Sequence, residues 1–246
     1  MEFRGPAAFV TLDRPPLNVL DLGMIRELRT ALAELETRRD AKVVVLRSAL
    51  PGTFSAGVDV AAHAPEEVGA MLEEFHDVFR IVDAMPQLVI AAVDGRCLGG
   101  GCELAVFSDV VLATRRSVFA QPEIDVGCFP PVAAVVLPRL VGRAAFEMIL
   151  TGATVNAAEA VRIGLITRVV TDLDAEVHRW TAALAAKSGA VLAIARRAVR
   201  QGGHDSFEVA LARAERLYRD ELTQTADCEE GVRAFLEKRP PVWTDR

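Results

Sequence analysis

The sequence predicts an α/β fold followed by a helical C-terminal region. Over the first two thirds of the 246 residues, short β-branched or aliphatic runs alternate with amphipathic stretches. Turns containing glycine or proline follow several of these runs. From about Leu173 the strand signals stop, and helical patterns continue to Lys238. We therefore expect a core over residues 1–172 and a helical region over residues 173–246, which is part of the same domain or packs against a neighbouring subunit.

Five runs are expected to form strands, because each is short, aliphatic and bounded by polar or turn residues. They are Ala7–Leu12, Lys42–Arg47, Leu88–Val93, Asp109–Ala113 and Ile166–Val170. The third run has no polar residue, which is typical of a strand covered on both faces.

Two amphipathic helices are expected between these strands. The first follows Pro15-Pro16 and has apolar residues at spacings of three and four. The second begins at Pro65, which suits a first helical turn, and stops at Pro86. Their apolar stripes are Leu22, Ile25, Leu28, Leu32 and Leu35 in the first helix, and Val68, Leu72, Phe75, Phe79 and Val82 in the second.

The C-terminal helices are expected to be interrupted at Ser188-Gly189 and Gly202-Gly203. Within them, Arg196, Arg197 and Arg200 form a basic cluster. We expect this cluster to be a solvated helix face, although it could also meet the phosphates of a ligand bound to an adjacent subunit.

Composition excludes several classes of protein. The chain is 51% hydrophobic and has 28 basic and 34 acidic residues, so it should fold compactly and carries no broad basic surface for nucleic acid. No apolar run reaches the length of a membrane span, and the N-terminus lacks the pattern of a secretory signal, so a cytoplasmic protein is expected. The cysteines are expected to be reduced thiols, and neither they nor the histidines have metal-site spacing. These residues are Cys97, Cys102, Cys128, Cys228, His63, His76, His178 and His204.

Two small-residue segments follow predicted strands. Phe54–Asp59 (Phe-Ser-Ala-Gly-Val-Asp) comes after the second strand, and Leu98–Phe107 opens with three glycines after the third. Small residues leave backbone N–H groups accessible at the edge of a sheet where ligands bind in open α/β folds. An ordinary turn is the alternative for Phe54–Asp59. Glycine is unfavourable inside a helix, so the triple glycine indicates a close approach to the backbone.

Two glutamates lie close to such segments. Glu103 follows the glycines among apolar neighbours, where burial should raise its pKa. It could instead cap a neighbouring helix or pair with an arginine. Glu123 lies 20 positions later, in a loop where a solvated carboxylate is the alternative. Two carboxylates and two sets of N–H donors suit the enolisation of a carbonyl compound. Asp125 is expected to be structural, and His63 to lie at the surface or at the mouth of the site.

These segments resemble the signature of the crotonase superfamily, the enoyl-CoA hydratases and isomerases. The resemblance rests on Phe54–Asp59, Ala92–Gly95, Leu98–Ala105 and Gln121–Ile124, and Leu150–Gly152 and Ala157–Ile166 extend it along nearly the whole chain. It implies a spiral of ββα units with a C-terminal helical trimerisation region, and an acyl-CoA substrate. It also implies a homotrimer or hexamer with no metal or redox cofactor, no nucleic acid partner and no membrane association.

The resemblance also assigns roles to residues. Backbone N–H groups of Val58 and Gly100 would form an oxyanion hole, and Ala56, Gly57, Val58, Asp59 and Gly100 would bind the CoA thioester. Glu103 and Glu123 would hold water and move protons, although the sequence does not decide which is acid and which is base. No histidine is close in sequence to Cys102, so we expect that residue to serve packing.

The segment after Glu123 departs from the family pattern. Straight-chain hydratases usually continue into a glycine-rich helix start, whereas this chain has Phe129, Pro130 and Pro131, which should form a stiffer apolar wall beside the acyl group. This variant, with Arg14–Asp21, resembles the hydratases that convert cyclohexa-1,5-diene-1-carbonyl-CoA into 6-hydroxycyclohex-1-ene-1-carbonyl-CoA in anaerobic aromatic degradation. The alternatives are an ordinary 2-enoyl-CoA hydratase or isomerase, and a noncatalytic CoA- or RNA-binding protein of this fold.

Overall fold

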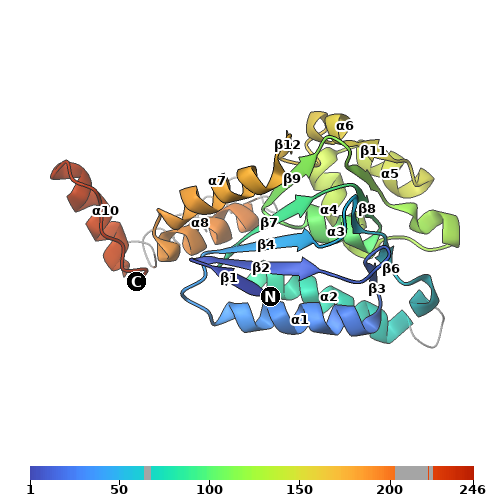
Figure 1. Ribbon diagram of the computed structural model, residues 1–246, viewed down its shortest axis with the longest axis horizontal. Coiled ribbons are helices and arrows are strands. Elements are labelled where there is room, and N and C mark those ends of the chain that lie inside the picture. Colours follow the sequence, from blue (N-terminus) through green and yellow to red (C-terminus); the bar gives the residue numbers. More distant parts are fainter. Residues whose placement is uncertain (64–67, 203–220, 222–223) are drawn as a thin grey trace.

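The repeating unit of the fold is a long strand, a short strand and a helix (Figure 1). The computed structural model describes residues 1–63, 68–202, 221 and 224–246, without the side chains of residues 63, 232–233 and 235–236. The predicted helix start at Pro65, the break at Gly202-Gly203 and His204 therefore lie wholly or partly outside the described residues, as does the side chain of His63.

The strands are β1 (Glu2–Arg4), β2 (Ala7–Leu12), β3 (Val19–Leu20), β4 (Val43–Ser48), β5 (Thr53–Ser55), β6 (Gly57–Val58), β7 (Leu88–Val93), β8 (Arg96–Leu98), β9 (Val110–Thr114), β10 (Val118–Ala120), β11 (Val155–Asn156) and β12 (Arg168–Val170). The α-helices are α1 (Leu22–Glu36), α2 (Val68–Ala84), α3 (Gly100–Val106), α4 (Pro131–Val141), α5 (Ala144–Thr151), α6 (Ala157–Arg162), α7 (Leu173–Ala185), α8 (Gly189–Gly202) and α10 (Ala226–Leu236). Two 3-10 helices, η1 (Val60–His63) and η2 (Pro122–Val126), complete the described elements.

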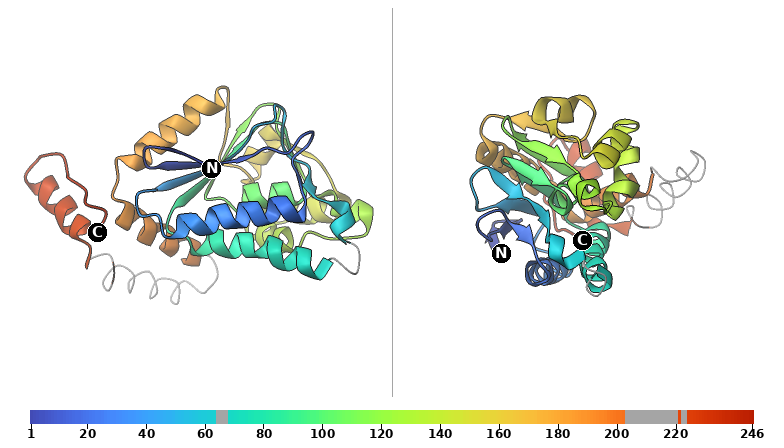
Figure 2. Two further views of the ribbon diagram at one scale, coloured as in Figure 1. Left: turned by 60° about the horizontal axis from the view of Figure 1, so that its bottom comes forward. Right: turned by 90° about the vertical axis from the view of Figure 1, so that its right-hand side faces the viewer.

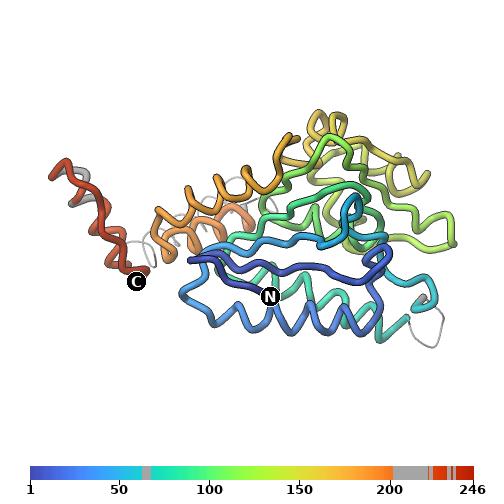
Figure 3. The backbone as a smooth tube through the Cα atoms, in the orientation of Figure 1, coloured from blue at the N-terminus to red at the C-terminus, as the bar shows by residue number. Residues whose placement is uncertain are grey.

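The chain moves repeatedly between two sheets, a path that can be followed in Figure 3. The larger sheet has the order β1-β2-β4-β7-β9-β12, and its strands are parallel apart from the β1–β2 pair. The smaller sheet has the order β11-β10-β8-β5. Thus β4, β7 and β9 are each followed by a short strand of the smaller sheet and then by a helix. This is the predicted spiral of ββα units.

Side-chain alternation along the larger sheet creates two apolar layers. Residues such as Val44 and Ala91 join α1, α2 and α3 in the main core, whereas Val45 and Ile90 pack towards α7. Figure 1 shows α1 and α2 on one side of the sheet and α7 on the other, and Figure 2 gives the same arrangement from two further directions.

The five predicted strands correspond to β2, β4, β7, β9 and β12, with boundaries that differ by at most two residues. The other seven described strands are two or three residues long, and such short strands show no periodic pattern in the sequence. Tertiary pairing creates them. The break before α8 at Ser188-Gly189 is confirmed.

Candidate active site

The passage from β8 into α3 requires glycine. Gly99 has φ of 51° and ψ of −131°, a conformation that side chains disfavour. A Cβ atom on Gly99 would also lie 2.8 Å from Oε1 of Glu123. The N–H of Gly99 donates to the carbonyl of Ala120 at 2.9 Å, which ties the glycine segment to β10. The sequence expectation of a close approach to this backbone is therefore confirmed, and one approaching group is Glu123.

The two small-residue segments meet at Gly57, Val58 and Gly100. A Cβ on Gly57, whose φ is 101°, would lie 3.4 Å from the nitrogen of Gly100. A Cβ on Gly100 would lie 2.7 Å from Cγ2 of Val58. The structure thus places the predicted oxyanion-hole residues side by side, although they are separated by 42 positions in the sequence.

The N–H of Gly100 is not used by the helix that this residue opens. The first helical hydrogen bond of α3 runs from the N–H of Glu103 to Gly99 at 2.9 Å, so the N–H of Gly100 precedes it. The N–H of Asp59 donates to Leu20 at 3.1 Å. Val58 itself lies opposite Leu20 in the parallel pair of β3 and β6.

Asn18 and Ser55 hold the Phe54–Asp59 segment in place. Asn18 is fully buried, has φ of 50° and donates through Nδ2 to the carbonyl of Phe54 at 3.0 Å. The Oγ of Ser55 donates to the carbonyl of Asn18 at 2.7 Å and accepts from the N–H of Gly57 at 3.1 Å. These bonds connect the loop before α1 with the predicted CoA-binding segment.

Glu103 lies inside the protein on α3, with 3% of its surface exposed. Its Oε1 accepts a hydrogen bond from the backbone N–H of Ala133, in the first turn of α4, at 2.8 Å. Burial raises the pKa of Glu103 to about 7, although the N–H of Ala133 opposes the rise and the nearby charge of Glu123 adds to it. The helix-capping alternative is therefore realised, in a carboxyl group that also has a shifted pKa.

Glu123 projects from η2 and is half-buried. Burial raises the pKa of Glu123 to about 7, and a hydrogen bond from its own backbone opposes the rise. Its Oε2 is buried and has no hydrogen-bond partner among the described residues. The solvated-carboxylate alternative is wrong, because a solvated carboxylate would keep its usual pKa and an accessible oxygen. Perturbed pKa values of this kind are typical of groups that transfer protons, so the two carboxyl groups are candidates for an acid and base pair.

The other residues predicted to belong to the site differ in their hydrogen bonds and in their exposure. Ala56 donates through its N–H to Leu17 at 3.0 Å, and Asp59 accepts from the N–H of Ala61 at 3.0 Å. Asp125 is exposed beside Gly152. Phe129 is 63% exposed, Pro130 is buried and Pro131 is the first residue of α4.

A profile of the enoyl-CoA hydratase/isomerase family matches residues 2–246. The chain belongs to this family. The predicted enzyme class, a hydro-lyase of the enoyl-CoA hydratase type, and the predicted crotonase fold are both confirmed.

Similar proteins cover almost the whole chain. The cyclohexa-1,5-dienecarbonyl-CoA hydratase of Thauera aromatica is 36% identical over 248 residues, which cover 100% of this chain and 96% of that protein. A probable enoyl-CoA hydratase of Rhodobacter capsulatus is 38% identical and covers 97% of this chain and 95% of its own length. The crystal structure of an enoyl-CoA hydratase from Bacillus anthracis has a TM-score of 0.94 at 28% identity, covering 100% of this chain and 98% of that chain.

The sequence did not indicate that Phe75 lies beside the candidate active site. Phe75 was expected only as part of an apolar helix stripe, yet a Cβ on Gly100 would lie 2.9 Å from its ring carbon Cζ. The periodicity of α2 predicts that Phe75 is buried but gives no indication of its partner. Only the packing of α2 against α3 reveals this contact.

The expectation that Arg196 and Arg200 form a solvated helix face is wrong. Their side chains are only 4% and 18% exposed, and both pair with Asp109. Arg197, which points in another direction from α8, is exposed and pairs with Glu221. The half-buried carboxylate of Asp109 and several backbone carbonyls explain the burial of Arg196, because they supply partners that sequence periodicity cannot show.

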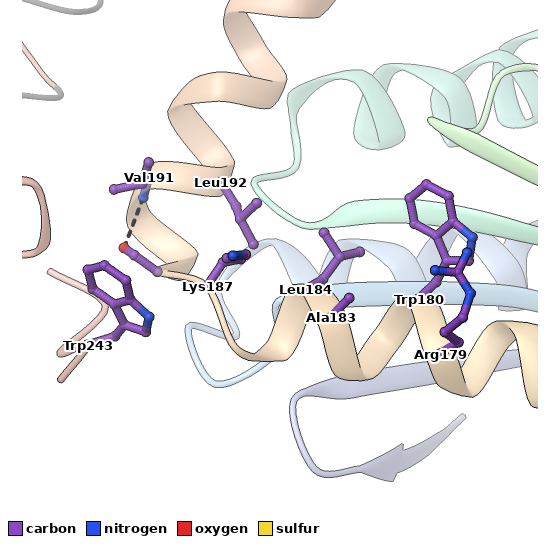
Figure 4. Close-up of a pocket in the computed structure, with 9 residues that line it drawn as sticks. Arg179, Trp180, Ala183, Leu184, Lys187, Val191, Leu192 and Trp243 are labelled. Atoms are coloured by element: carbon purple, nitrogen blue, oxygen red, sulfur yellow. Dashed lines mark hydrogen bonds between the residues drawn. The ribbon is translucent and has the colours of Figure 1, made fainter. Parts of the chain in front are cut away.

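An apolar pocket of about 510 Å³ lies away from the two glutamates. Trp180 and Leu184 of α7, Leu192 of α8 and Trp243 of the C-terminal segment line it (Figure 4).

In the described part of the chain, no helix is long and apolar enough to cross a bilayer. Cys97 and Cys102 are buried free thiols, which confirms the expected packing role of Cys102.

Proposed function

We propose that this protein adds water to a cyclic conjugated dienoyl-CoA thioester, with cyclohexa-1,5-diene-1-carbonyl-CoA as substrate and 6-hydroxycyclohex-1-ene-1-carbonyl-CoA as product. The observation that carries the proposal is the meeting of the Val58 and Gly100 segments next to two glutamates of raised pKa. The Thauera relative, whose name gives this activity, supports the choice of substrate.

In the proposed complex, the thioester oxygen accepts hydrogen bonds from the N–H groups of Val58 and Gly100. Negative charge develops on this oxygen when water attacks the β-carbon, so both donors act more strongly in the transition state than in the ground state. Removing one such donor from other enzymes costs about 2.7–4 kcal/mol of transition-state stabilisation. Glycine at position 100 leaves the backbone open to this contact.

The two glutamates divide the proton transfers. The N–H of Ala133 stabilises the charged form of Glu103, so we assign the role of base to Glu103 and the role of acid to Glu123. Glu103 takes a proton from water while the hydroxyl group bonds to the ring carbon β to the thioester. The double bonds shift, and Glu123 delivers a proton to the far end of the second double bond. The two steps together add one water molecule by 1,4-addition, and proton exchange restores both carboxyl groups.

The apolar wall of the acyl site is proposed to include Phe129, Pro130 and Pro131. Prolines at the start of α4 restrict the backbone there, which suits a rigid ring better than a flexible chain. Proton transfer with an enolate needs no electron carrier, so we propose a reaction without metal or redox cofactor. We also propose a cytoplasmic homotrimer, or a hexamer made of two trimers.

The experiment that tests this function is a substrate panel on the purified protein. Hydration of crotonyl-CoA is followed by the loss of its conjugated thioester absorbance. Hydration of the cyclic diene is followed by the change from dienoyl to monoenoyl thioester absorbance, because its product keeps one double bond conjugated with the carbonyl. The expected result is a higher kcat/KM for the cyclic diene. A much higher kcat/KM for crotonyl-CoA would instead identify an ordinary 2-enoyl-CoA hydratase, which the 38% identical Rhodobacter protein favours. Binding without turnover of either compound would indicate a noncatalytic protein.

A further inference from the structure

Arg196 of α8 binds the end of α2 from within the protein. Its Nη1 donates to the carbonyl of Met85 at 2.6 Å and its Nη2 to the carbonyl of Val82 at 2.6 Å. Its Nε donates to Oδ2 of Asp109 at 2.7 Å. The guanidinium therefore caps the C-terminal end of α2 and is itself neutralised by a carboxylate. Figure 2 shows α8 in orange beside this end of α2 in its left view.

Arg200, one helical turn further along α8, binds the end of α3. Its Nη2 donates to the carbonyl of Phe107 at 2.7 Å, and its guanidinium lies 4.8 Å from the centre of the Phe107 ring. Its Nε donates to Oδ1 of Asp109 at 2.8 Å, so a single carboxylate joins both arginines. Asp109 also accepts from the N–H of Val89 at 2.8 Å, which attaches the two arginines and Asp109 to the start of strand β7.

Both helices held in this way lead to the candidate active site. α3 has seven residues, and so runs for about 10 Å from Gly100 to the Phe107 carbonyl. α2 covers a similar distance of about 10 Å from Phe75, which contacts Gly100, to the Val82 carbonyl. Phe79 of α2 contacts Phe107 at the end of α3 edge-to-face, with ring centres 5.2 Å apart. Within α2, Phe79 also contacts Phe75 edge-to-face, with ring centres 5.0 Å apart.

We propose that Arg196 and Arg200 are positioning residues that set the location of the Gly100 N–H relative to that of Val58. The inference rests on the proposed oxyanion hole. The arginines hold the distant ends of α2 and α3, and the packed phenylalanines transmit that position to the Gly100 backbone. Because proteins pack at high density, a small shift at one end of α3 moves its other end as well. A helix of the C-terminal region thereby controls an element of the reaction site that it does not touch.

Lysine substitutions test the proposal. Arg196→Lys and Arg200→Lys keep the charge but replace the planar fork of five N–H donors by a single nitrogen, which cannot hold Asp109 and a backbone carbonyl in the same geometry. Arg197→Lys is the matched control, since Arg197 lies on the same helix with an exposed side chain. We expect kcat to fall about 10- to 100-fold in the two test variants, the range that a misplaced group produces, with KM changed less than about threefold. The control should resemble the unmodified protein.

The infrared stretch of the bound thioester carbonyl provides a second readout. The probe is butanoyl-CoA labelled with ¹³C at the carbonyl, because it is saturated and cannot be hydrated. We expect the unmodified protein to lower the carbonyl frequency and both test variants to lower it less. Folded Arg196→Lys and Arg200→Lys proteins with an unchanged kcat and an unchanged carbonyl shift would overturn the positioning role. If Arg196→Lys does not fold, the kcat and the carbonyl shift of Arg200→Lys alone test the positioning role, because Arg200 is the more exposed of the two arginines. No carbonyl shift in the unmodified protein would instead contradict the proposed oxyanion hole itself.

Discussion

Oε1 of Glu103 lies 2.8 Å from the backbone nitrogen of Ala133, so a buried carboxyl group of α3 caps the first turn of α4. Pro131 has no N–H, and Ala133 and Val132 are among the first residues of α4 that can donate to a carboxylate. Both contribute to holding down the pKa of Glu103 against the effect of burial. The proline-rich segment after Glu123 therefore bears directly on the protonation of Glu103.

Replacing either carboxyl group by an amide should nearly abolish hydration. Glutamine keeps the shape of the side chain but transfers no proton, so we expect Glu103→Gln and Glu123→Gln each to lower kcat by at least about 10²-fold. Steady-state kinetics on the best substrate of the panel provide the measurement, with circular dichroism to verify folding. Losses below about tenfold in both variants would remove the assigned acid and base roles.

The rate should depend on pH in a bell shape with its maximum near 7. Burial raises the pKa of each glutamate to about 7, and the proposed mechanism needs one charged and one neutral carboxyl group. Below the maximum both groups gain protons and the base is lost. Above it both lose protons and the acid is lost. A profile of kcat/KM from pH 5 to 9 measures two apparent values that belong to the pair. A rate that stays constant over that range would contradict the mechanism.

Glu103 should also make the folded state less stable as pH rises. Its pKa is about 7 in the folded protein against 4.5 for the ordinary group, so the folded state binds more protons between these values. Stability therefore falls as pH increases through this window, on the order of 3 kcal/mol from this residue. Urea unfolding at pH 4.5 and pH 7.5 should show a larger decline for the unmodified protein than for Glu103→Gln. Equal declines would mean that Glu103 titrates normally.

A methyl group at position 100 should impair the site. The Cβ of Gly100→Ala would lie 2.7 Å from Cγ2 of Val58 and 2.9 Å from the Phe75 ring, so one of these groups must move. We expect kcat to fall about 10²-fold, as for other small misplacements of reacting groups. Gly69→Ala is the control, because Gly69 is an exposed residue of α2 with no atom within 4 Å of an added Cβ. It should leave kcat unchanged and stabilise the helix by about 0.4–1 kcal/mol. Equal kcat values for the two variants would contradict the tight packing at Gly100.

Loss of the Asn18 side chain should destabilise the whole Phe54–Asp59 segment. Its amide donates to the carbonyl of Phe54 at 3.0 Å and its Oδ1 accepts from the N–H of Arg14 at 2.7 Å. Asn18→Ala leaves the buried carbonyl of Phe54 without this partner, at a cost of about 1–3 kcal/mol, and also removes the part-buried hydrogen bond from Arg14. Thermal unfolding measures the effect, and Thr30→Ala on the exposed face of α1 serves as the control. A melting temperature as high as that of the control would show that the network is dispensable.

Several features could be predicted from the sequence because they depend on local patterns. The aliphatic runs of β2 and β7 and the spacing of apolar residues in α1 and α2 report burial along one element. The glycines before Glu103 indicate a close backbone contact wherever the chain folds. These signals predicted the α/β core, the helical C-terminal region and the two glutamates.

Tertiary structure alone decided which groups these residues meet. The arginines of α8 looked like a solvated face, because helical spacing cannot reveal that Asp109 and the ends of α2 and α3 lie against them. Likewise, the sequence placed Phe75 in a core but not against Gly100, and placed Glu103 near glycines but not at the start of α4. A pattern along the chain reports how a side chain is oriented relative to its own element. Its partner, and therefore its pKa and its contribution to the reaction, depends on contacts between elements that are distant in sequence.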